Sequence, residues 1–409
     1  MEKHLQCRQK IVAWDFNPPD FEGFGGKVGL GQDIKRLADG DLLLVFHAGY
    51  WHMSLATPWD IPQEDVNKYI ANGFRSNHKA PNGGRIMGMR SSDDGLTWSK
   101  PFDILVQPTD VGPQGLNVLN DGTVLIFVNN QASWYGYDKA PAGHMKLNTR
   151  TGIICSTDNG KTWSESVWFD CPYDFYERGF CNSIQLPDGS LLYATYCMSS
   201  ASKQLFGAIH KSIDKGQTWE CISTIERSDG KNIDEPAIAL LPSGKIILLT
   251  RPDGAIFYSQ DQGRTWEYSH KPAWDDADPN RTTDKVKSPR LIVLDDGTLV
   301  CYFTGHGVLA VSWSTDEGLT WHNEADGKPY LLDPDAYGYP GGCLMKDGSV
   351  FVVYYDATHK QQRTIVWGIR LKINDARDSF EVLPAPGVKE PGKIDDAAKT
   401  KGTLDVDVM

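Results

Sequence analysis

Five side chains suited to acid–base or nucleophilic chemistry stand at equivalent distances from short glycine turns. Glu235 and Tyr339 each precede a glycine by nine residues, and His47, Arg251 and Tyr355 each follow one by seven. A carboxylate beside a phenol can take its proton, which activates a group that is otherwise a poor nucleophile with a pKa of about 10. An arginine can hold an anionic group through paired hydrogen bonds. The set therefore predicts nucleophilic or proton-transfer chemistry.

The glycines from which these spacings are counted belong to six similar sequence phrases. The phrases are ADGDLLLVF, NDGTVLIFV, PDGSLLYAT, PSGKIILLT, DDGTLVCYF and KDGSVFVVY, with glycines at 40, 122, 189, 244, 297 and 348. Each phrase predicts a tight turn that leads into a β-strand. Residues equally distant from a hairpin turn lie opposite each other. The pairs expected at the far end of the hairpins are Gly31/His47, Pro113/Asn129, Phe180/Tyr196, Glu235/Arg251, Ser288/Thr304 and Tyr339/Tyr355. We expect the substrate pocket at that face.

A second phrase, Ser-x-Asp-x-Gly-x-Thr-Trp, occurs five times. Its copies begin at Ser91, Ser156, Ser212, Ser259 and Ser314. The aspartate can cap a turn through its carboxylate, the glycine accepts a positive φ, and the tryptophan supplies apolar area for packing between repeats. Five separated copies cannot share one catalytic site. Each copy therefore predicts a structural turn on the outer rim, away from the pocket.

The repeats predict an all-β fold, a six-bladed β-propeller with four strands in each blade. The chain has 409 residues and is rich in turn-forming and aromatic types, with 40 Gly, 23 Pro and 13 Trp. An open ring would expose two strand edges, so we expect a strand over Ile11–Phe16 to pair beside Ile365–Ile373. The propeller is expected over residues 1–387. Residues 388–409, poor in apolar types, are expected to form a mobile tail.

Composition excludes several classes of function. The net charge of −12 argues against nucleic-acid binding, and the absence of an 18-residue apolar run argues against a membrane span. No apolar signal region follows Met1, so we expect a cytoplasmic protein, or a secreted or periplasmic one if a leader was removed. The eight cysteines form no CxxC pair, which predicts free thiols. No cofactor or metal is expected, and the oligomeric state stays open.

The two phrases together resemble the sialidase superfamily, whose Asp-box repeats decorate a six-bladed propeller. The resemblance covers about residues 10–375. The segment NIDEPAIALLPSG is similar to the one that holds the nucleophile-activating glutamate, which maps to Glu235. LLTR places Arg251 at a carboxylate-binding arginine position, and YGYPGGCLMKDG places Tyr339 at the nucleophile position. The resemblance thus implies a Tyr nucleophile activated by Glu.

The chain departs from this family at two of the three arginine positions. Gln32, beside Gly31, stands at the first, and His306 stands at the third. Arg290 and Arg178 lie near strand starts and are candidate replacements. Losing two arginines weakens the multi-arginine grip on a carboxylate, which makes ordinary sialic acid a doubtful substrate.

A long loop after the first hairpin supplies the remaining candidates. Asp60 has the best spacing for the acid/base residue, and Asp65 comes next. Trp51 in the same loop is expected to contact sugar, together with Tyr355. An alternative role for Trp51 is to pack the loop alone.

We therefore expect an exo-acting glycoside hydrolase that removes an acidic or unusual terminal sugar from a glycan. The first alternative is a propeller polysaccharide lyase acting on a uronate-containing glycan. In a lyase, His47, His306 or Tyr339 would transfer protons and Arg251 would neutralise the carboxylate. The second alternative is a glycan-binding propeller without catalysis.

Overall fold

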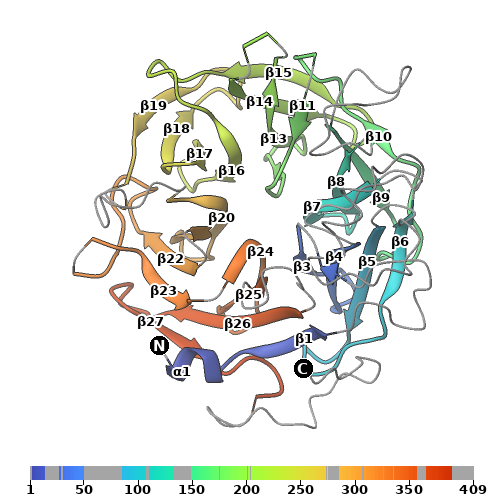
Figure 1. The fold of residues 1–409 in the computed structure, drawn as a ribbon, viewed down its shortest axis with the longest axis vertical. Coiled ribbons are helices and arrows are strands. Elements are labelled where there is room, and N and C mark those ends of the chain that lie inside the picture. Colours follow the sequence, from blue (N-terminus) through green and yellow to red (C-terminus); the bar gives the residue numbers. More distant parts are fainter. Residues whose placement is uncertain are drawn as a thin grey trace, which may run out of the picture.

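The computed structural model is a six-bladed β-propeller whose blades are arranged around a central axis (Figure 1), which confirms the predicted fold. It describes residues 2–13, 27–28, 31–49, 85–106, 110–131, 149–174, 176–199, 201–202, 204–272, 274, 285–305, 308–325, 327–334, 336–356 and 365–388. No helix among these residues is long and apolar enough to cross a membrane.

The strands follow one another from the axis outward in each blade. Blade 1 holds β2 (Lys27–Val28), β3 (Asp33–Arg36), β4 (Leu42–Gly49), β5 (Arg85–Ser91) and β6 (Phe102–Val106). Blade 2 holds β7 (Asp110–Val118), β8 (Val124–Gln131), β9 (Thr149–Ser156) and β10 (Val167–Trp168). Blade 3 holds β11 (Tyr176–Arg178), β12 (Ile184–Gln185), β13 (Leu191–Met198), β14 (Leu205–Ser212) and β15 (Glu220–Ile225).

The second half of the ring repeats this plan. Blade 4 holds β16 (Asp234–Leu240), β17 (Ile246–Arg251), β18 (Ala255–Ser259) and β19 (Glu267–His270). Blade 5 holds β20 (Lys287–Val293), β21 (Leu299–Gly305), β22 (Val308–Ser314) and β23 (Tyr330–Asp333). Blade 6 holds β24 (Ala336–Leu344), β25 (Val350–Asp356), β26 (Ile365–Ile373) and β27 (Phe380–Leu383), and receives β1 (Gln9–Ala13), which follows the helix α1 (Glu2–Gln6).

The N-terminal strand closes the ring, as the sequence predicted. β1 pairs antiparallel with β26, with Gln9 opposite Gly368 and Ala13 opposite Ile365, while β27 pairs with the far half of β26. The predicted extension of this strand to residue 16 lies outside the described residues. At the other end of the chain, Val388 was predicted to begin the tail, but it is buried in an apolar cluster. Residues 389–409 lie outside the described part.

The Asp-box turns join the last two strands of blades 1 to 5, on the outer side of each blade as predicted. In the copy that begins at Ser156, the Asp158 carboxylate accepts hydrogen bonds from the Thr162 N–H at 2.9 Å and the Thr162 hydroxyl at 2.6 Å. Gly160 donates its N–H to the Ser156 hydroxyl at 2.8 Å and has a φ of 73°. The motif residues form these hydrogen bonds with one another, within one turn. The turn chemistry predicted for the aspartate and glycine is therefore confirmed.

Blade 6 has a turn of the same kind that the sequence search missed. Between β26 and β27, Asn374 Oδ1 accepts the N–H groups of Asp378 at 3.1 Å and Ser379 at 3.2 Å, and Arg377 has a φ of 60°. An amide replaces the aspartate and an arginine takes the left-handed conformation, which explains why no copy of the phrase was found here.

The innermost strands meet at the axis through a buried aspartate. Asp33 on β3 accepts the N–H of Gly342 on β24 at 3.0 Å and the N–H of Leu116 on β7 at 2.9 Å. These bonds join blades 6, 1 and 2. The approach is close: a Cβ added to Gly341 would lie 2.4 Å from the Cα of Asp33, so only glycine fits there. The inner ends of these strands are therefore held in a fixed arrangement.

The hairpin register differs from the prediction at the start of the inner strands. Arg251 lies opposite Asp234 rather than Glu235, and Tyr355 lies opposite Gly338 rather than Tyr339. The register shifts because a β-bulge adds a residue in β16, β20 and β24. The bulges leave Glu235, Ser288 and Tyr339 at positive φ values of 43°, 49° and 51°. A bulge bends the strand and redirects the side chain that it carries.

Candidate functional site

Glu235, near the start of the inner strand β16, accepts three hydrogen bonds. Its side chain is 1 % exposed and its Oε1 accepts a hydrogen bond from Arg251 Nη1 at 2.8 Å. Its Oε2 accepts the Ser288 N–H at 2.7 Å and the Ser288 hydroxyl at 2.9 Å. Burial by itself raises the pKa of Glu235, but the charges of Arg251 and Lys287 and the Ser288 hydrogen bonds outweigh it. The pKa of Glu235 is therefore below its ordinary value, and the group is a carboxylate at neutral pH.

Tyr339 lies in blade 6, two blades from Glu235, yet the two side chains interact electrostatically. The Tyr339 residue is 3 % exposed, and its ring lies 4.8 Å from the ring of Phe180, measured between centroids. Burial, the Glu235 charge and Tyr355 raise the pKa of Tyr339 well above its ordinary value, against the opposing effects of Arg251 and Arg178. The phenol is therefore protonated at neutral pH and has an ionised carboxylate in its field.

Three cationic side chains from three adjacent blades surround this pair. Arg251 donates a hydrogen bond to Glu235, Lys287 Nζ lies 5.1 Å from the centre of the Tyr339 ring, and the charge of Arg178, on β11, opposes the rise in the pKa of Tyr339. Arg178 had been predicted as a candidate replacement for a missing arginine. Lys287 was missed, because it immediately precedes Ser288 and only the position nine residues before the glycine was considered. The bulge in β20 pairs Lys287 with Thr304, one of the predicted pair positions.

Gln32 contacts the backbone that carries Tyr339. Its Nε2 donates to the carbonyl of Gly338 at 3.0 Å and to the carbonyl of Tyr339 at 2.7 Å, and its side chain is fully buried. An amide nitrogen has two hydrogens, so both are used. We interpret Gln32, predicted to bind substrate, as a positioning residue that fixes the left-handed bulge at Tyr339.

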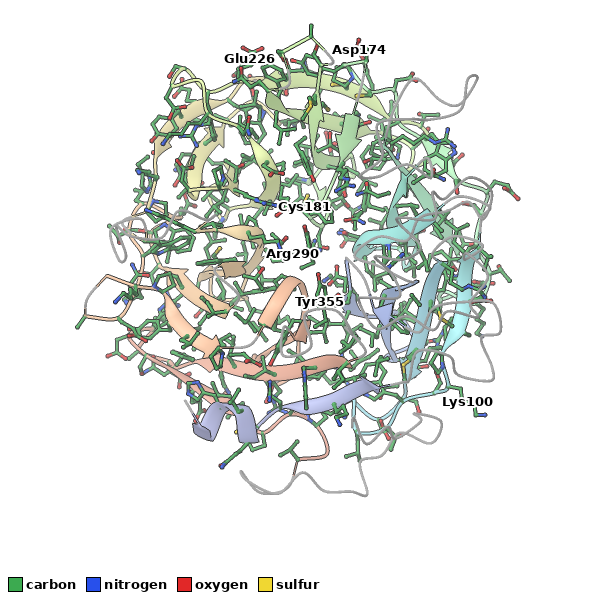
Figure 2. All side chains as sticks on the ribbon, in the orientation of Figure 1. Lys100, Asp174, Cys181, Glu226, Arg290 and Tyr355 are labelled. Atoms are coloured by element: carbon green, nitrogen blue, oxygen red, sulfur yellow. The ribbon has the colours of Figure 1, made fainter. Side chains whose placement is uncertain are left out.

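Arg290 lies near the axis, as its label in Figure 2 shows, and is 2 % exposed. Its Nε donates to the carbonyl of Pro340 at 2.8 Å and its Nη2 to the carbonyl of Gln114 at 3.0 Å. These bonds join blades 5, 6 and 2. The sequence proposed Arg290 as a substitute substrate-binding arginine, and the structure gives its guanidinium a role in holding the inner strands together.

The other predicted site residues fall in two groups. Tyr355 is fully buried on β25, labelled near the axis in Figure 2, and contributes to the raised pKa of Tyr339. His47 is fully buried on β4 in blade 1. The catalytic candidates Asp60 and Asp65 and the binding candidates Trp51 and His306 lie outside the described residues.

The described group can supply a base, a nucleophile and an anion-binding surface. An ionised carboxylate and a protonated phenol are the two forms that a base and a nucleophile need before reaction. Left-handed conformations of non-glycine residues are uncommon and concentrate at functional sites and tight turns, and here three adjacent blades each provide one near the start of the inner strand, beside the one in their outer turn.

Two curated proteins match about two thirds of the chain. A "Sialidase" of Bacteroides fragilis is 25 % identical over 304 residues, which cover 66 % of this chain and 53 % of that protein. A "Xyloglucanase" of Hypocrea jecorina is 26 % identical over 291 residues, 64 % of this chain and 31 % of that protein. The chain thus spans about half or less of the length of these curated relatives.

Solved structures share the fold at low identity. A protein of unknown function from Dyadobacter fermentans matches with a TM-score of 0.65 and 17 % identity, covering 90 % of this chain and 99 % of that one. A Hadza microbial sialidase matches with a TM-score of 0.60 and 18 % identity, covering 84 % of this chain and 67 % of that one. The family model described as "BNR repeat-like domain" matches residues 133–352, more than half of the chain. The chain therefore belongs to the BNR repeat-like domain family, and its matches are consistent with the resemblance to the sialidase superfamily that its Asp-box phrases carry.

Proposed function

We propose that this protein is a retaining glycoside hydrolase that releases an acidic terminal sugar from a glycan, with Tyr339 as nucleophile and Glu235 as its base. One observation carries the proposal. Bulges in two blades bring Glu235 and Tyr339 into each other's electrostatic field, both nearly fully buried. The similarity to a sialidase supports the reaction class.

The chemistry follows from the two protonation states. Tyr339 Oη attacks the anomeric carbon while Glu235 takes the phenolic proton, and the glycosidic C–O bond breaks as the Tyr–sugar bond forms. The leaving oxygen needs a proton from an acid, for which we propose Asp60. Water then attacks the same carbon and gives a proton to the Asp60 carboxylate, the Tyr–sugar bond breaks, and the proton held by Glu235 returns to Tyr339. Glu235 Oε1 keeps one lone pair free for this transfer, because only Arg251 donates to it among the described residues.

The cations define the substrate class. Arg251, Lys287 and Arg178 take the place of the family's three arginines and would hold a carboxylate or another anionic group of the sugar. Arg251 also has to hold Glu235, so the anion would rely on the shared charge of all three groups rather than on one bidentate pair. His306, Trp51 and Tyr355 are proposed as further contacts.

A covalent trapping experiment tests the nucleophile. The wild type, incubated with fluorinated acidic glycosides, should gain the mass of one sugar, and peptide mapping should place it on Tyr339. Tyr339→Phe should give no adduct. Tyr302→Phe is the matched control, since Tyr302 is a fully buried phenol whose hydroxyl has no hydrogen-bond partner among the described residues. An adduct that persists in Tyr339→Phe, or an unsaturated product without any adduct, would exclude the proposed mechanism.

A further inference from the structure

A compact group of metal-binding side chain types lies in blade 3. The ligand atoms of Cys171, Glu177 and Cys197 all lie within 4.8 Å of one another. Cys171 belongs to the turn before β11, a turn that reaches Asp174, labelled at the outer edge of the ring in Figure 2. Glu177 on β11 lies directly opposite Cys197 on β13. Three segments of one blade therefore converge on this group.

One carboxylate oxygen of Glu177 has no hydrogen-bond partner among the described residues. Its Oε1 accepts from Thr195 Oγ1 at 2.9 Å and from Cys197 Sγ at 3.8 Å, and contacts His210 Nε2 at 2.6 Å. Its Oε2 is buried and has no hydrogen-bond partner among the residues that the structure describes. The Glu177 side chain is 0 % exposed. A buried carboxylate with one unsatisfied oxygen is costly unless a cation compensates it.

We propose that Cys171, Glu177 and Cys197 form a binding site for a zinc ion. Zinc prefers thiolate, imidazole and carboxylate ligands in a tetrahedron, with Zn–S distances of about 2.3 Å, which places two thiolates about 3.8 Å apart. The ligand atoms of the cluster, all within 4.8 Å of one another, are already near this spacing. A carboxylate oxygen of Glu177 would be the third protein ligand, and water could complete the tetrahedron from the side of Cys171, the half-buried member of the group.

The surroundings of Glu177 also suit a metal. His210 is fully buried and contacts Glu177 Oε1, so it would orient the carboxylate from outside the ligand set. A disulfide between Cys171 and Cys197 is the competing use of the two thiols. A disulfide would leave Glu177 Oε2 without a partner, whereas zinc would satisfy all three groups.

The site would stabilise the wall of the candidate active site. Side chains alternate between the two faces of a strand. Arg178 follows Glu177 on β11, and Tyr196 precedes Cys197 on β13, so each neighbour points to the opposite face from its metal ligand. Arg178 acts on Tyr339, and Tyr196 stacks near Phe180 with ring centroids 6.2 Å apart. Zinc on one face would therefore fix the strand pair that carries these two residues.

Metal binding to the full chain tests this proposal. The reduced protein, stripped with a chelator, should take up one equivalent of Zn²⁺ in competition with a chromophoric chelator. Co²⁺ should give a thiolate-to-metal charge-transfer band. Cys171→Ser and Glu177→Gln should each weaken Zn²⁺ binding by more than about 100-fold, because loss of an outer partner alone typically costs 10–100-fold. Cys155→Ser, which changes another partly buried free thiol in blade 2, should bind like the wild type.

Circular dichroism and thermal unfolding check that each variant folds. The half-buried Cys171 makes Cys171→Ser the variant best able to keep the fold, and zinc should raise the melting temperature of the wild type but not that of Cys171→Ser. The proposal is overturned if the reduced wild type binds neither metal. It is also overturned if Cys171→Ser binds as tightly as Cys155→Ser, or if mass mapping of the unreduced protein finds Cys171 and Cys197 in a disulfide.

Discussion

Replacing Gln32 by alanine should loosen the segment that carries Tyr339. The Gln32 amide donates to two buried carbonyls, those of Gly338 at 3.0 Å and Tyr339 at 2.7 Å. Each such bond contributes about 1 kcal/mol net, and a buried carbonyl left without a donor costs about as much again or more. Gln32→Ala should therefore lower the free energy of unfolding by about 2–4 kcal/mol, beyond the loss caused by the smaller side chain.

The variant Gln114→Ala separates the cost of losing the Gln32 hydrogen bonds from the cost of a smaller side chain. Gln114 is also a fully buried glutamine at the axis, but its amide nitrogen makes a single 3.4 Å contact with the carbonyl of Gly112 on its own strand. Both variants lose the same side-chain volume. We expect Gln32→Ala to be less stable than Gln114→Ala by about 2 kcal/mol, a factor of about 30 in the folding equilibrium.

Urea unfolding followed by tryptophan fluorescence measures this difference through the two midpoints at equal slope. Tyr339 has a φ of 51°, an uncommon conformation for an aromatic residue that the cross-blade bonds help to hold. In Gln32→Ala we also expect kcat to fall with little change in KM, because the nucleophile is misplaced while the cations remain. Equal midpoints for the two variants would show that Gln32 does not hold this segment.

Three further outcomes follow from the site and the axis. Arg251→Ala should cost about 2–5 kcal/mol in kcat/KM for an acidic substrate and less for a neutral analogue, measured side by side; equal losses would place the anion elsewhere. The pKa of Glu235 is lowered in the folded state, so its charge contributes stability above the unfolded pKa of about 4.3, and this contribution is lost as the pH falls through the folded value. The difference in unfolding free energy between wild type and Glu235→Gln should therefore shrink from about pH 7 to about pH 3 in urea titrations; a constant difference would contradict this assignment. Gly341→Ala should cost more than about 4 kcal/mol, since its Cβ would lie 2.4 Å from the Cα of Asp33, whereas Gly348→Ala, with open space but a φ of 77°, should cost about 1–2 kcal/mol by thermal unfolding. Similar losses for the two glycine variants would refute the close approach at the axis.

The fold could be predicted because its signals are local. An Asp-box such as Ser156–Trp163 satisfies its own hydrogen bonds within eight residues, so its sequence specifies its turn wherever it occurs. The hairpin glycines work in the same way, and counting outward from them located Glu235, Arg251 and Tyr339. The sequence phrase did not predict the turn of blade 6, because Asn374 forms a similar hydrogen-bond network with different residues.

The details of the site depended on contacts between distant segments. The bulges that redirect Glu235 and Tyr339 are not visible in the hairpin count, which assumes regular pairing. Lys287 became part of the site only because the bulge in β20 changes which residue pairs with Thr304.

The sequence by itself determined the blades, their number and the strand ends at which chemistry could occur, because turns and strand alternation depend on neighbouring residues. Only the tertiary structure decided what each polar side chain does there. Gln32 and Tyr339 are 307 residues apart, and Arg290 and Gln114 are 176 apart, so their contacts exist only once the ring has closed. Cys171, Glu177 and Cys197 likewise meet only when β11 pairs with β13. Contacts of this kind are set by the geometry of the closed ring, and no short stretch of sequence specifies them.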